Sequence, residues 1–146
     1  MGRNKENLHL NDNANALEPG TPDRDKLHKI RPLIDHLLLQ FLDLPQEQMI
    51  NIDEQLVPFE GRSGIKQYLP NTPYKWGYKI FVACDTKGLV HSFDVFTGKI
   101  EKVHNCPDLA ASSNIVLKLV QNLDKNANHL LYFDNWFSSE KLLVEL

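Results

Sequence analysis

The sequence predicts an α/β domain in which a mixed β-sheet is flanked by helices. Three observations support this fold class. Short apolar runs that are typical of strands occur at residues 50–57, 78–85 and 89–98. Apolar residues at helical spacing then follow at 109–123, and another strand-like run occupies 129–134. Strands that are followed by a helix and a further strand are typical of mixed sheets.

The composition is that of an ordinary globular protein. Of the 146 residues, 42% are hydrophobic and 24% are charged, and the net charge is −3. No apolar run approaches the roughly 20 residues of a membrane span, and the N-terminus lacks the apolar core of a secretory signal. We therefore expect an intracellular protein of one modest domain plus a tail, without a membrane partner.

Cys84 and Cys106 are too few for a disulfide framework, so we expect both to be reduced packing thiols. His104 and Cys106 could supply two ligands of a zinc site. Because a tetrahedral zinc site needs about four ligands and the others are not in view, zinc binding is the weaker interpretation.

Residues 1–20 are rich in Asn, Glu and Lys, and they bury too little apolar surface to offset the entropy of ordering. We expect a flexible leader there. Thr21, which is followed by proline, predicts the start of a helix. Pro32 should break or restart that helix, so residues 32–43 form its firmer part. The segment 21–48 is therefore predicted to be helical.

A tight turn and a crossover helix define the predicted sheet. The turn at 86–88 joins the second and third strands into an antiparallel hairpin, and Gly88 can supply a positive φ. The helix at 109–123 can carry the chain back so that the fourth strand pairs parallel with the first. This arrangement is a mixed sheet of the ribonuclease H type. A last helix follows, capped by Ser138 or Ser139.

Two acids lie on strands that this topology would bring together. Asp53 interrupts the first apolar run, where a buried charge is costly unless it is paired or binds a metal ion. Asp134 stands at the carboxyl end of the fourth strand. Mg²⁺ and Mn²⁺ prefer carboxylate ligands, and pairs of such ions support phosphodiester chemistry. The alternatives are that Asp53 is a structural acid and that Asp134 is a turn residue.

Three other acids are weaker candidates. Glu54 should point away from Asp53 because side chains alternate along a strand, so we expect it to be outward-facing or salt-bridged. Asp85 is interpreted as a turn residue, and Asp94 as part of a solvated face.

The chain between Arg62 and Cys84 is locally basic, because it contains no Asp or Glu. Its cations alternate with aromatic residues, and this combination can contact phosphates and stack on exposed bases. The alternative is a surface connection whose aromatic rings pack onto the sheet. The candidate DNA-binding residues are Arg62, Lys66, Lys75 and Lys79.

Two blocks resemble the transposase core of the piggyBac superfamily and its domesticated relatives. The first, IDEQLVPFEGRSGIKQYLPNTPYKWGYKIFVACD, carries the family's IDEQ, a GR pair and the pattern YxPxKPxKxGxK, with Thr72 in place of the first Lys. The second, YFDNWFSSEKLLVEL, matches the family's DNWF(T/S)S. The resemblance covers about residues 24–146.

This resemblance implies a ribonuclease H-like domain at 49–146, in which a triad of acids binds two divalent ions, Mg²⁺ or Mn²⁺. Matched residue by residue, the first acid is Asp53 and the second is Asp134. Such transposases cleave DNA and join the ends at TTAA targets, so DNA is an implied partner and the nucleus an implied location. Residues 24–49 resemble the end of a dimerisation and DNA-binding region.

The family's third aspartate lies downstream of the second block and has no match up to Leu146. We therefore expect a domain that is incomplete at the C-terminus. One hypothesis is a domain related to metal-dependent DNA strand cleavage and transfer that is inactive alone. The second is a non-catalytic domesticated module that binds DNA or a related transposase. The third is an unrelated structural domain with a coincidental acid pair.

Overall fold

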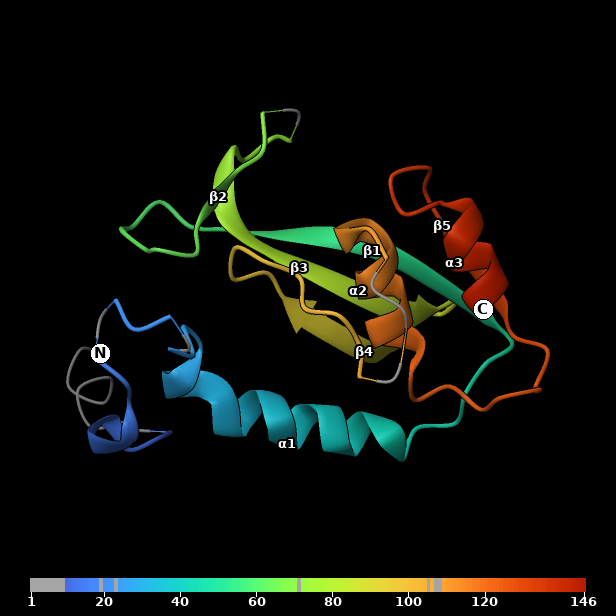
Figure 1. Cartoon of the computed structure of the whole chain (residues 1–146), viewed down its shortest axis with the longest axis horizontal. Coiled ribbons are helices and arrows are strands. Elements are labelled where there is room, and N and C mark those ends of the chain that lie inside the picture. The colour runs from blue at the N-terminus through green and yellow to red at the C-terminus, as the bar shows by residue number, and fades with distance from the viewer. Residues whose placement is uncertain (1–9, 19, 23, 71, 105, 107–108) are drawn as a thin grey trace. The chain divides into compact units, whose positions relative to one another are not determined.

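The computed structural model describes residues 10–18, 20–22, 24–70, 72–104, 106 and 109–146. Its contacts divide the chain into two compact units, Met1–Gln40 and Phe41–Leu146. The second unit has the mixed α/β fold that the sequence predicts (Figure 1). Residues 1–9 of the expected leader lie outside the described residues.

The described part of the expected leader carries local structure. A 3-10 turn, η2 (Asn13–Asn15), is capped by Asp12, whose carboxylate accepts a 2.9 Å hydrogen bond from the Ala14 backbone N–H. Asn11 donates a 2.8 Å hydrogen bond to the backbone carbonyl of His28. Flexibility of the leader in solution stays a prediction.

The expected helix start at Thr21 is wrong. The chain instead forms turns, then a short 3-10 helix, η3 (His28–Ile30), and then α1 (Arg31–Leu42). Pro32 is the second residue of α1, where its missing N–H costs no intrahelical hydrogen bond. The proline therefore marks where the regular helix begins, as its predicted restarting role requires.

The Asp25 side chain accounts for the late start. Its Oδ1 accepts a 2.9 Å hydrogen bond from the Leu27 backbone N–H, and the Arg31 guanidinium donates two hydrogen bonds of 2.8 Å to the same carboxylate. The hydrogen bond from Arg31 is the main reason that the pKa of Asp25 is lowered. An aspartate that binds the backbone two residues ahead stabilises a turn, which competes with helix formation at this point.

The sheet contains five strands. They are β1 (Met49–Pro58), β2 (Gln67–Tyr68), β3 (Trp76–Asp85), β4 (Val90–Val95) and β5 (Leu130–Phe133). The order across the sheet is β2-β3-β1-β5, and β4 also pairs with β3. Only β2 was missed by the sequence prediction, because two residues are too few to show a periodic pattern.

The pairing directions are those that the crossover predicts. β3 runs antiparallel to β1 over a register from Ile50↔Asp85 to Pro58↔Gly77, and β4 runs antiparallel to β3. β5 pairs parallel with β1, from Met49↔Leu130 to Ile52↔Phe133. The prediction of a fourth strand parallel to the first is therefore confirmed.

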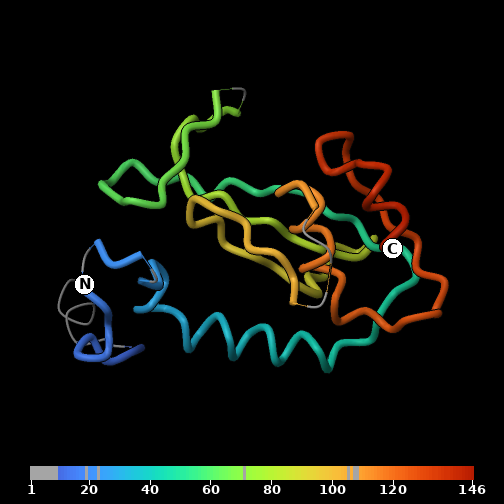
Figure 2. The backbone as a smooth tube through the Cα atoms, viewed as in Figure 1, coloured from blue at the N-terminus to red at the C-terminus, as the bar shows by residue number. Residues whose placement is uncertain are grey.

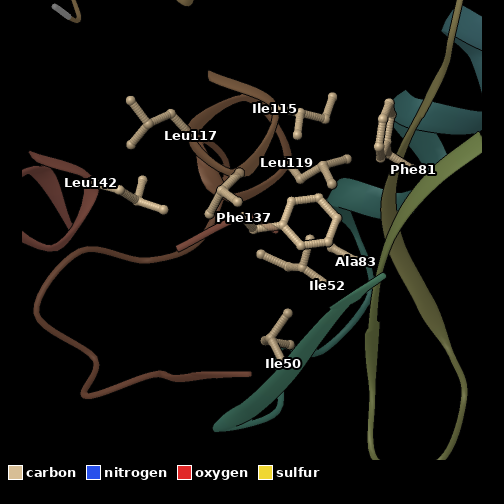
Figure 3. Close-up of a cluster of buried hydrophobic side chains, with 10 residues drawn as sticks. Ile50, Ile52, Phe81, Ala83, Ile115, Leu117, Leu119, Phe137 and Leu142 are labelled. Atoms are coloured by element: carbon tan, nitrogen blue, oxygen red, sulfur yellow. The ribbon is translucent and has the colours of Figure 1, made fainter. Parts of the chain in front are cut away.

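Two helices contribute to the core on one face of the sheet. They are α2 (Ala111–Val120), which forms the crossover, and α3 (Glu140–Glu145). Figure 3 shows their side chains meeting those of β1 and β3 around Phe137, which is 1% exposed. Each fully buried side chain of this size contributes about 1.5–3 kcal/mol of hydrophobic stabilisation. The buried cluster consists of Ile50, Ile52, Phe81, Ala83, Ile115, Val116, Leu117, Leu119, Phe137 and Leu142.

Polar side chains fix the start of each helix. The Asn114 amide makes two hydrogen bonds of 3.1 Å with the backbone N–H and carbonyl of Leu109, which stabilises the entry into α2. Ser139 caps α3 by accepting a 3.1 Å hydrogen bond from the Leu142 backbone N–H. Its Oγ also lies 2.9 Å from the Oγ of buried Ser113 on α2. Of the two predicted capping serines, Ser139 is therefore the cap.

Asp85 organises the turn between β3 and β4. Its Oδ1 accepts backbone hydrogen bonds from Lys87 at 2.8 Å and Leu89 at 2.9 Å, and Gly88 adopts a φ of 80°. Its Oδ2 lies 3.6 Å from Nε2 of His91. The predicted turn role of Asp85 is confirmed.

Asp94 is half-buried and pairs with Lys118 of α2 at 2.7 Å, so the predicted solvated role is wrong for this acid.

Replacing Gly77 with Ala should destabilise the sheet, because the new Cβ would lie 2.3 Å from the backbone carbonyl oxygen of Val57. Relieving this overlap requires the β1 and β3 backbones to separate, at a cost of about 1–3 kcal/mol. Urea unfolding measures the change. Gly64→Ala is the matched control, since its Cβ would meet nothing within 4 Å. Equal stability of the two variants would contradict the close approach at Gly77.

Stability should also fall in acid through Asp85. Burial opposes ionisation of this carboxyl, but hydrogen bonds from the Leu89 and Lys87 backbone N–H groups, together with the nearby His91 ring at 3.6 Å, outweigh it and hold its pKa below the ordinary 3.8. A lowered folded-state pKa stabilises the fold above the unfolded pKa, and this contribution is lost as the pH falls through the folded value.

The measurement is the urea midpoint between about pH 5 and about pH 3. Asp85→Asn keeps a side-chain oxygen for the turn but cannot titrate, so its midpoint should fall less steeply than that of the parent chain. Parallel pH profiles for both chains would show that Asp85 does not carry this dependence.

Candidate metal and DNA site

The two candidate acids follow a pair of register partners. Ile52 of β1 and Phe133 of β5 are the last partners in the parallel pairing, and Asp53 and Asp134 are the next residues on the two chains. Side chains alternate along a strand, so both acids continue the face opposite to the buried Ile52. The register therefore puts the two acids at equivalent positions on neighbouring strands.

Both acids are exposed, which corrects one expectation. Ile50 and Ile52 of β1 face the core. Asp53 follows Ile52 and lies on the opposite, exposed face of the strand. The expected desolvation cost at Asp53 is therefore absent. The period of two along a strand explains the difference, because an apolar run can hold a charge on its solvent face without burying it.

A backbone N–H orients each carboxylate. Oδ1 of Asp53 accepts a 2.7 Å hydrogen bond from the N–H of Glu54, and Oδ1 of Asp134 accepts a 2.8 Å hydrogen bond from the N–H of Trp136. Within the described part of the chain, the second oxygen of each carboxylate accepts no hydrogen bond. These two oxygens are of the kind that a hard divalent ion binds, with water or phosphate oxygens completing its coordination.

The acid pair has no third ligand among the described residues. No group of three or more His, Cys, Asp and Glu side chains that could hold a metal ion occurs in the ranges that the structure describes. The donor chemistry of Asp53 and Asp134 therefore fits Mg²⁺ or Mn²⁺, but with two protein ligands. Their role as metal ligands stays a prediction.

Glu54 faces away from Asp53 and forms an ion pair with Lys79 of β3, so its predicted salt-bridged position is confirmed. The Lys79 side chain is only 15% exposed. Its Nζ lies 4.8 Å from the centroid of the Phe81 ring and 4.9 Å from that of Trp136. Lys79 is therefore enclosed by a carboxylate and two aromatic rings. No sequence pattern predicts this cluster, because its members come from three distant segments.

The DNWFSS block forms one compact turn after β5. The Asp134 carbonyl accepts hydrogen bonds of 3.2 Å from the Phe137 N–H and from the Ser138 hydroxyl. Trp136 is half-exposed and stacks on Phe81 with a centroid separation of 6.0 Å and an interplanar angle of 6°. Phe137 is buried in the core. This block therefore joins one candidate ligand, Asp134, directly to the packing of the domain.

The basic arm, defined as residues 59–75, connects β1 to β3 and includes β2 (Figure 2). Lys66 donates a 2.8 Å hydrogen bond to the Gly61 carbonyl, and its Nζ lies 4.9 Å from the Trp76 ring. Arg62 and Lys75 are exposed and have no ion-pair partner among the described residues. The arm therefore presents two exposed cations and one that is held in place.

Most of the aromatic residues in and beside the basic arm are also accessible. Tyr68 is 49% exposed, Tyr74 65% and Trp76 47%, and the rings of Tyr68 and Trp76 lie 4.8 Å apart. Tyr78 differs, because it is half-buried and stacks on Phe59 at 4.8 Å. The alternative of aromatic rings that pack onto the protein thus holds for Tyr78, whereas the other three leave ring surface open.

His104 and Cys106, the candidate zinc ligands, line a cavity together with His129. Asn105 between them lies outside the described residues. His129 already interacts through Nδ1 with the backbone carbonyl of Glu47 at 3.0 Å, and its buried Nε2 has no hydrogen-bond partner among the residues that the structure describes. These three residues are not among the groups that could hold a metal ion in the described ranges.

Comparison with known proteins identifies the family. The family described as Transposase IS4 matches residues 5–146. PiggyBac transposable element-derived protein 3 of Homo sapiens is 32% identical over 143 residues, which are 96% of this chain and 23% of that protein. PiggyBac transposable element-derived protein 2 of Homo sapiens is 30% identical over 140 residues, covering 93% of this chain and 22% of that protein. The chain belongs to the piggyBac family of transposase-derived proteins.

A solved structure agrees with this family. The piggyBac transposase in a synaptic complex with hairpin DNA, determined by cryo-EM, matches with a TM-score of 0.79 and 26% identity, over 95% of this chain and 28% of that one. This match confirms that the present chain has the ribonuclease H-like fold that was predicted from its sequence. The chain spans about a quarter of the length of these relatives. In its described ranges, no helix has the length and apolarity needed to cross a membrane.

Proposed function

We propose that this piggyBac-family chain supplies two metal-binding acids and a DNA-contacting arm to a domain related to metal-dependent DNA strand cleavage and transfer. The observation that carries the proposal is the position of Asp53 and Asp134 directly after register partners on β1 and β5. Both acids are exposed, and each keeps one carboxylate oxygen free of hydrogen bonds within the described residues.

Backbone hydrogen bonds orient the two carboxylates in a way that would favour binding of a cation. Each has one oxygen held by a backbone N–H, which limits its rotation, and a second oxygen for a ligand. A bound Mg²⁺ or Mn²⁺ would help to activate an attacking oxygen and to stabilise a leaving oxygen in phosphodiester chemistry. Exposure of both acids leaves room for a DNA phosphate beside them.

The basic arm is proposed to contact the DNA backbone. Arg62 and Lys75 project without ion pairs in the described structure, so they can bind phosphates without breaking a salt bridge. Lys66 is held beside Trp76, and its hydrogen-bond partners are backbone carbonyls, which leave its charge unneutralised. A few such cations give a modest affinity that weakens as salt increases.

Family membership supports the other parts of the proposal. The solved relative is described as a complex with hairpin DNA, which favours DNA as a partner of this chain. That relative forms a synaptic complex, which favours assembly of this chain with a second copy or a related transposase. Membership of a family that acts on DNA favours a nuclear location for this chain.

A second candidate function is a non-catalytic module that binds DNA or a related transposase. It is favoured by the small number of candidate metal ligands. The described residues offer two acids, and not a cluster of three or more. With only two protein ligands, an ion is less firmly fixed, and geometric control of an in-line displacement is weaker. The two candidates share the basic arm and differ in whether the acids support chemistry.

Strand cleavage should distinguish the two candidates. Purified chain is incubated with Mn²⁺ and supercoiled plasmid, beside Asp53→Ala and Asp134→Ala. If the acids support chemistry, nicking should be lost in both variants. DNA binding without nicking would select the non-catalytic module, and equal nicking by all three chains would identify a contaminating nuclease. Circular dichroism should show both variants folded, because the substituted side chains are exposed.

The arm can be tested by its salt dependence. Replacing Arg62 and Lys75 together with Gln removes about two phosphate contacts, so the slope of log affinity against log salt should fall by about two for duplex DNA. Fluorescence anisotropy with a labelled duplex provides the measurement. The charge-matched control replaces Lys102 and Lys125, which are exposed but lie outside the arm. The same loss in both double variants would mean that only net charge matters.

A further inference from the structure

Lys79 differs from the other cations of the basic segment. Arg62 and Lys75 are exposed, whereas the Lys79 side chain is 15% exposed and forms an ion pair with Glu54. Its ammonium also lies over the rings of Phe81 and Trp136, at 4.8 and 4.9 Å. A cation that is enclosed by a carboxylate and two ring faces is already neutralised and largely desolvated. A phosphate would have to displace these partners before binding it.

The partners of Lys79 are connected to the two acids. Glu54, which pairs with Lys79, donates its backbone N–H to Oδ1 of Asp53 at 2.7 Å. Trp136, whose ring lies beneath the same ammonium, donates its backbone N–H to Oδ1 of Asp134 at 2.8 Å. The side chain of one residue on β3 therefore contacts both residues whose N–H groups orient the candidate metal ligands.

This bridge lies beyond the end of the pairing between β1 and β5. The parallel register between β1 and β5 ends at Ile52↔Phe133, one residue before the acids. The N–H donor for Asp134 belongs to the turn after β5, which is attached to the core through Phe137. Contacts among Lys79, Glu54 and Trp136 therefore join this turn to β1 and β3, which are still paired with each other here, beyond the last β1–β5 pair.

We propose that Lys79 is a positioning residue that fixes Asp53 and Asp134 relative to one another, and that it does not contact DNA phosphate. The importance of this arrangement for metal binding rests on the proposed function. The arrangement itself does not, so the two claims can fail separately. The attraction of Lys79 to Glu54 and to the aromatic rings predicts that Arg, a cation that also stacks on aromatic faces, will substitute better than an uncharged side chain.

The first measurement follows the amide protons of Glu54 and Trp136 in ¹⁵N-labelled chain by NMR. Lys79→Met keeps much of the apolar stem but removes the charge. We expect altered amide proton shifts at both residues and hydrogen exchange faster by about threefold or more. Lys79→Arg should restore much of the parent behaviour. The matched control, Lys75→Met, should leave both amides unchanged.

The second measurement compares Mn²⁺ binding, followed by electron paramagnetic resonance of the free ion, with DNA retention at low salt. Lys79→Met should weaken Mn²⁺ binding by about threefold or more while retaining DNA like the parent chain. Lys75→Met should show the opposite pattern. Urea unfolding of each variant establishes that the binding measurements are made on folded protein. If Lys79→Met does not fold, Glu54→Gln breaks the same ion pair from the other side.

The outcomes separate the two claims. Unchanged Glu54 and Trp136 amides in a folded Lys79→Met chain would overturn the positioning role, as would a loss of DNA retention equal to that of Lys75→Met. If the parent chain binds Mn²⁺ no better than a chain carrying Asp53→Asn and Asp134→Asn, the proposed metal function fails. Perturbed amides would still support the positioning of the two acids in that case.

Discussion

The parallel pairing of β5 with β1 is the constraint on which the rest of the domain depends. β5 is only four residues long, and its register partners are Met49 to Ile52 of β1. The α2 crossover makes this pairing possible, and the chain that follows β5 delivers Phe137 and Leu142 to the buried cluster. The same pairing puts Asp53 and Asp134 one residue beyond its last register partners, Ile52 and Phe133. Core formation and acid placement therefore have a common origin.

Several residues of the family motifs have a structural role in the fold. Gly77 occurs where the backbone of β1 approaches too closely for any Cβ. Phe137 fills the core, and Ser139 caps α3 while contacting Ser113 of α2. The presence of these residues in a chain consequently indicates the architecture, but does not by itself indicate catalysis. Asp53 and Asp134 contribute nothing to the core, so any evidence for catalysis must come from them.

Sequence periodicity predicted the elements whose burial is regular. The strands, the hairpin at Gly88 and the crossover helix followed from alternating or helical apolar spacing. The helix start at Thr21 was wrong because the carboxylate of Asp25 stabilises a turn and binds Arg31. A local capping pattern cannot show that a nearby side chain will compete for the backbone.

Tertiary contacts explain the other differences. The enclosure of Lys79 needs Glu54 and Trp136, which are separated from it in sequence and come together only when β1, β3 and β5 have assembled. From the sequence alone, Lys79 is one more cation in a basic segment. Arg62 and Lys75 are exposed because they lie in the connection and not in the sheet, and their contact with DNA stays a prediction.

The two faces of β1 differ in burial. Ile50 and Ile52 face the core, while Asn51 and Asp53 alternate with them on the exposed side. An exposed carboxylate pays little desolvation energy, so the fold does not require a metal ion to tolerate Asp53. This reverses the initial argument from burial, and places the case for a metal site on the register with Asp134 and on the family.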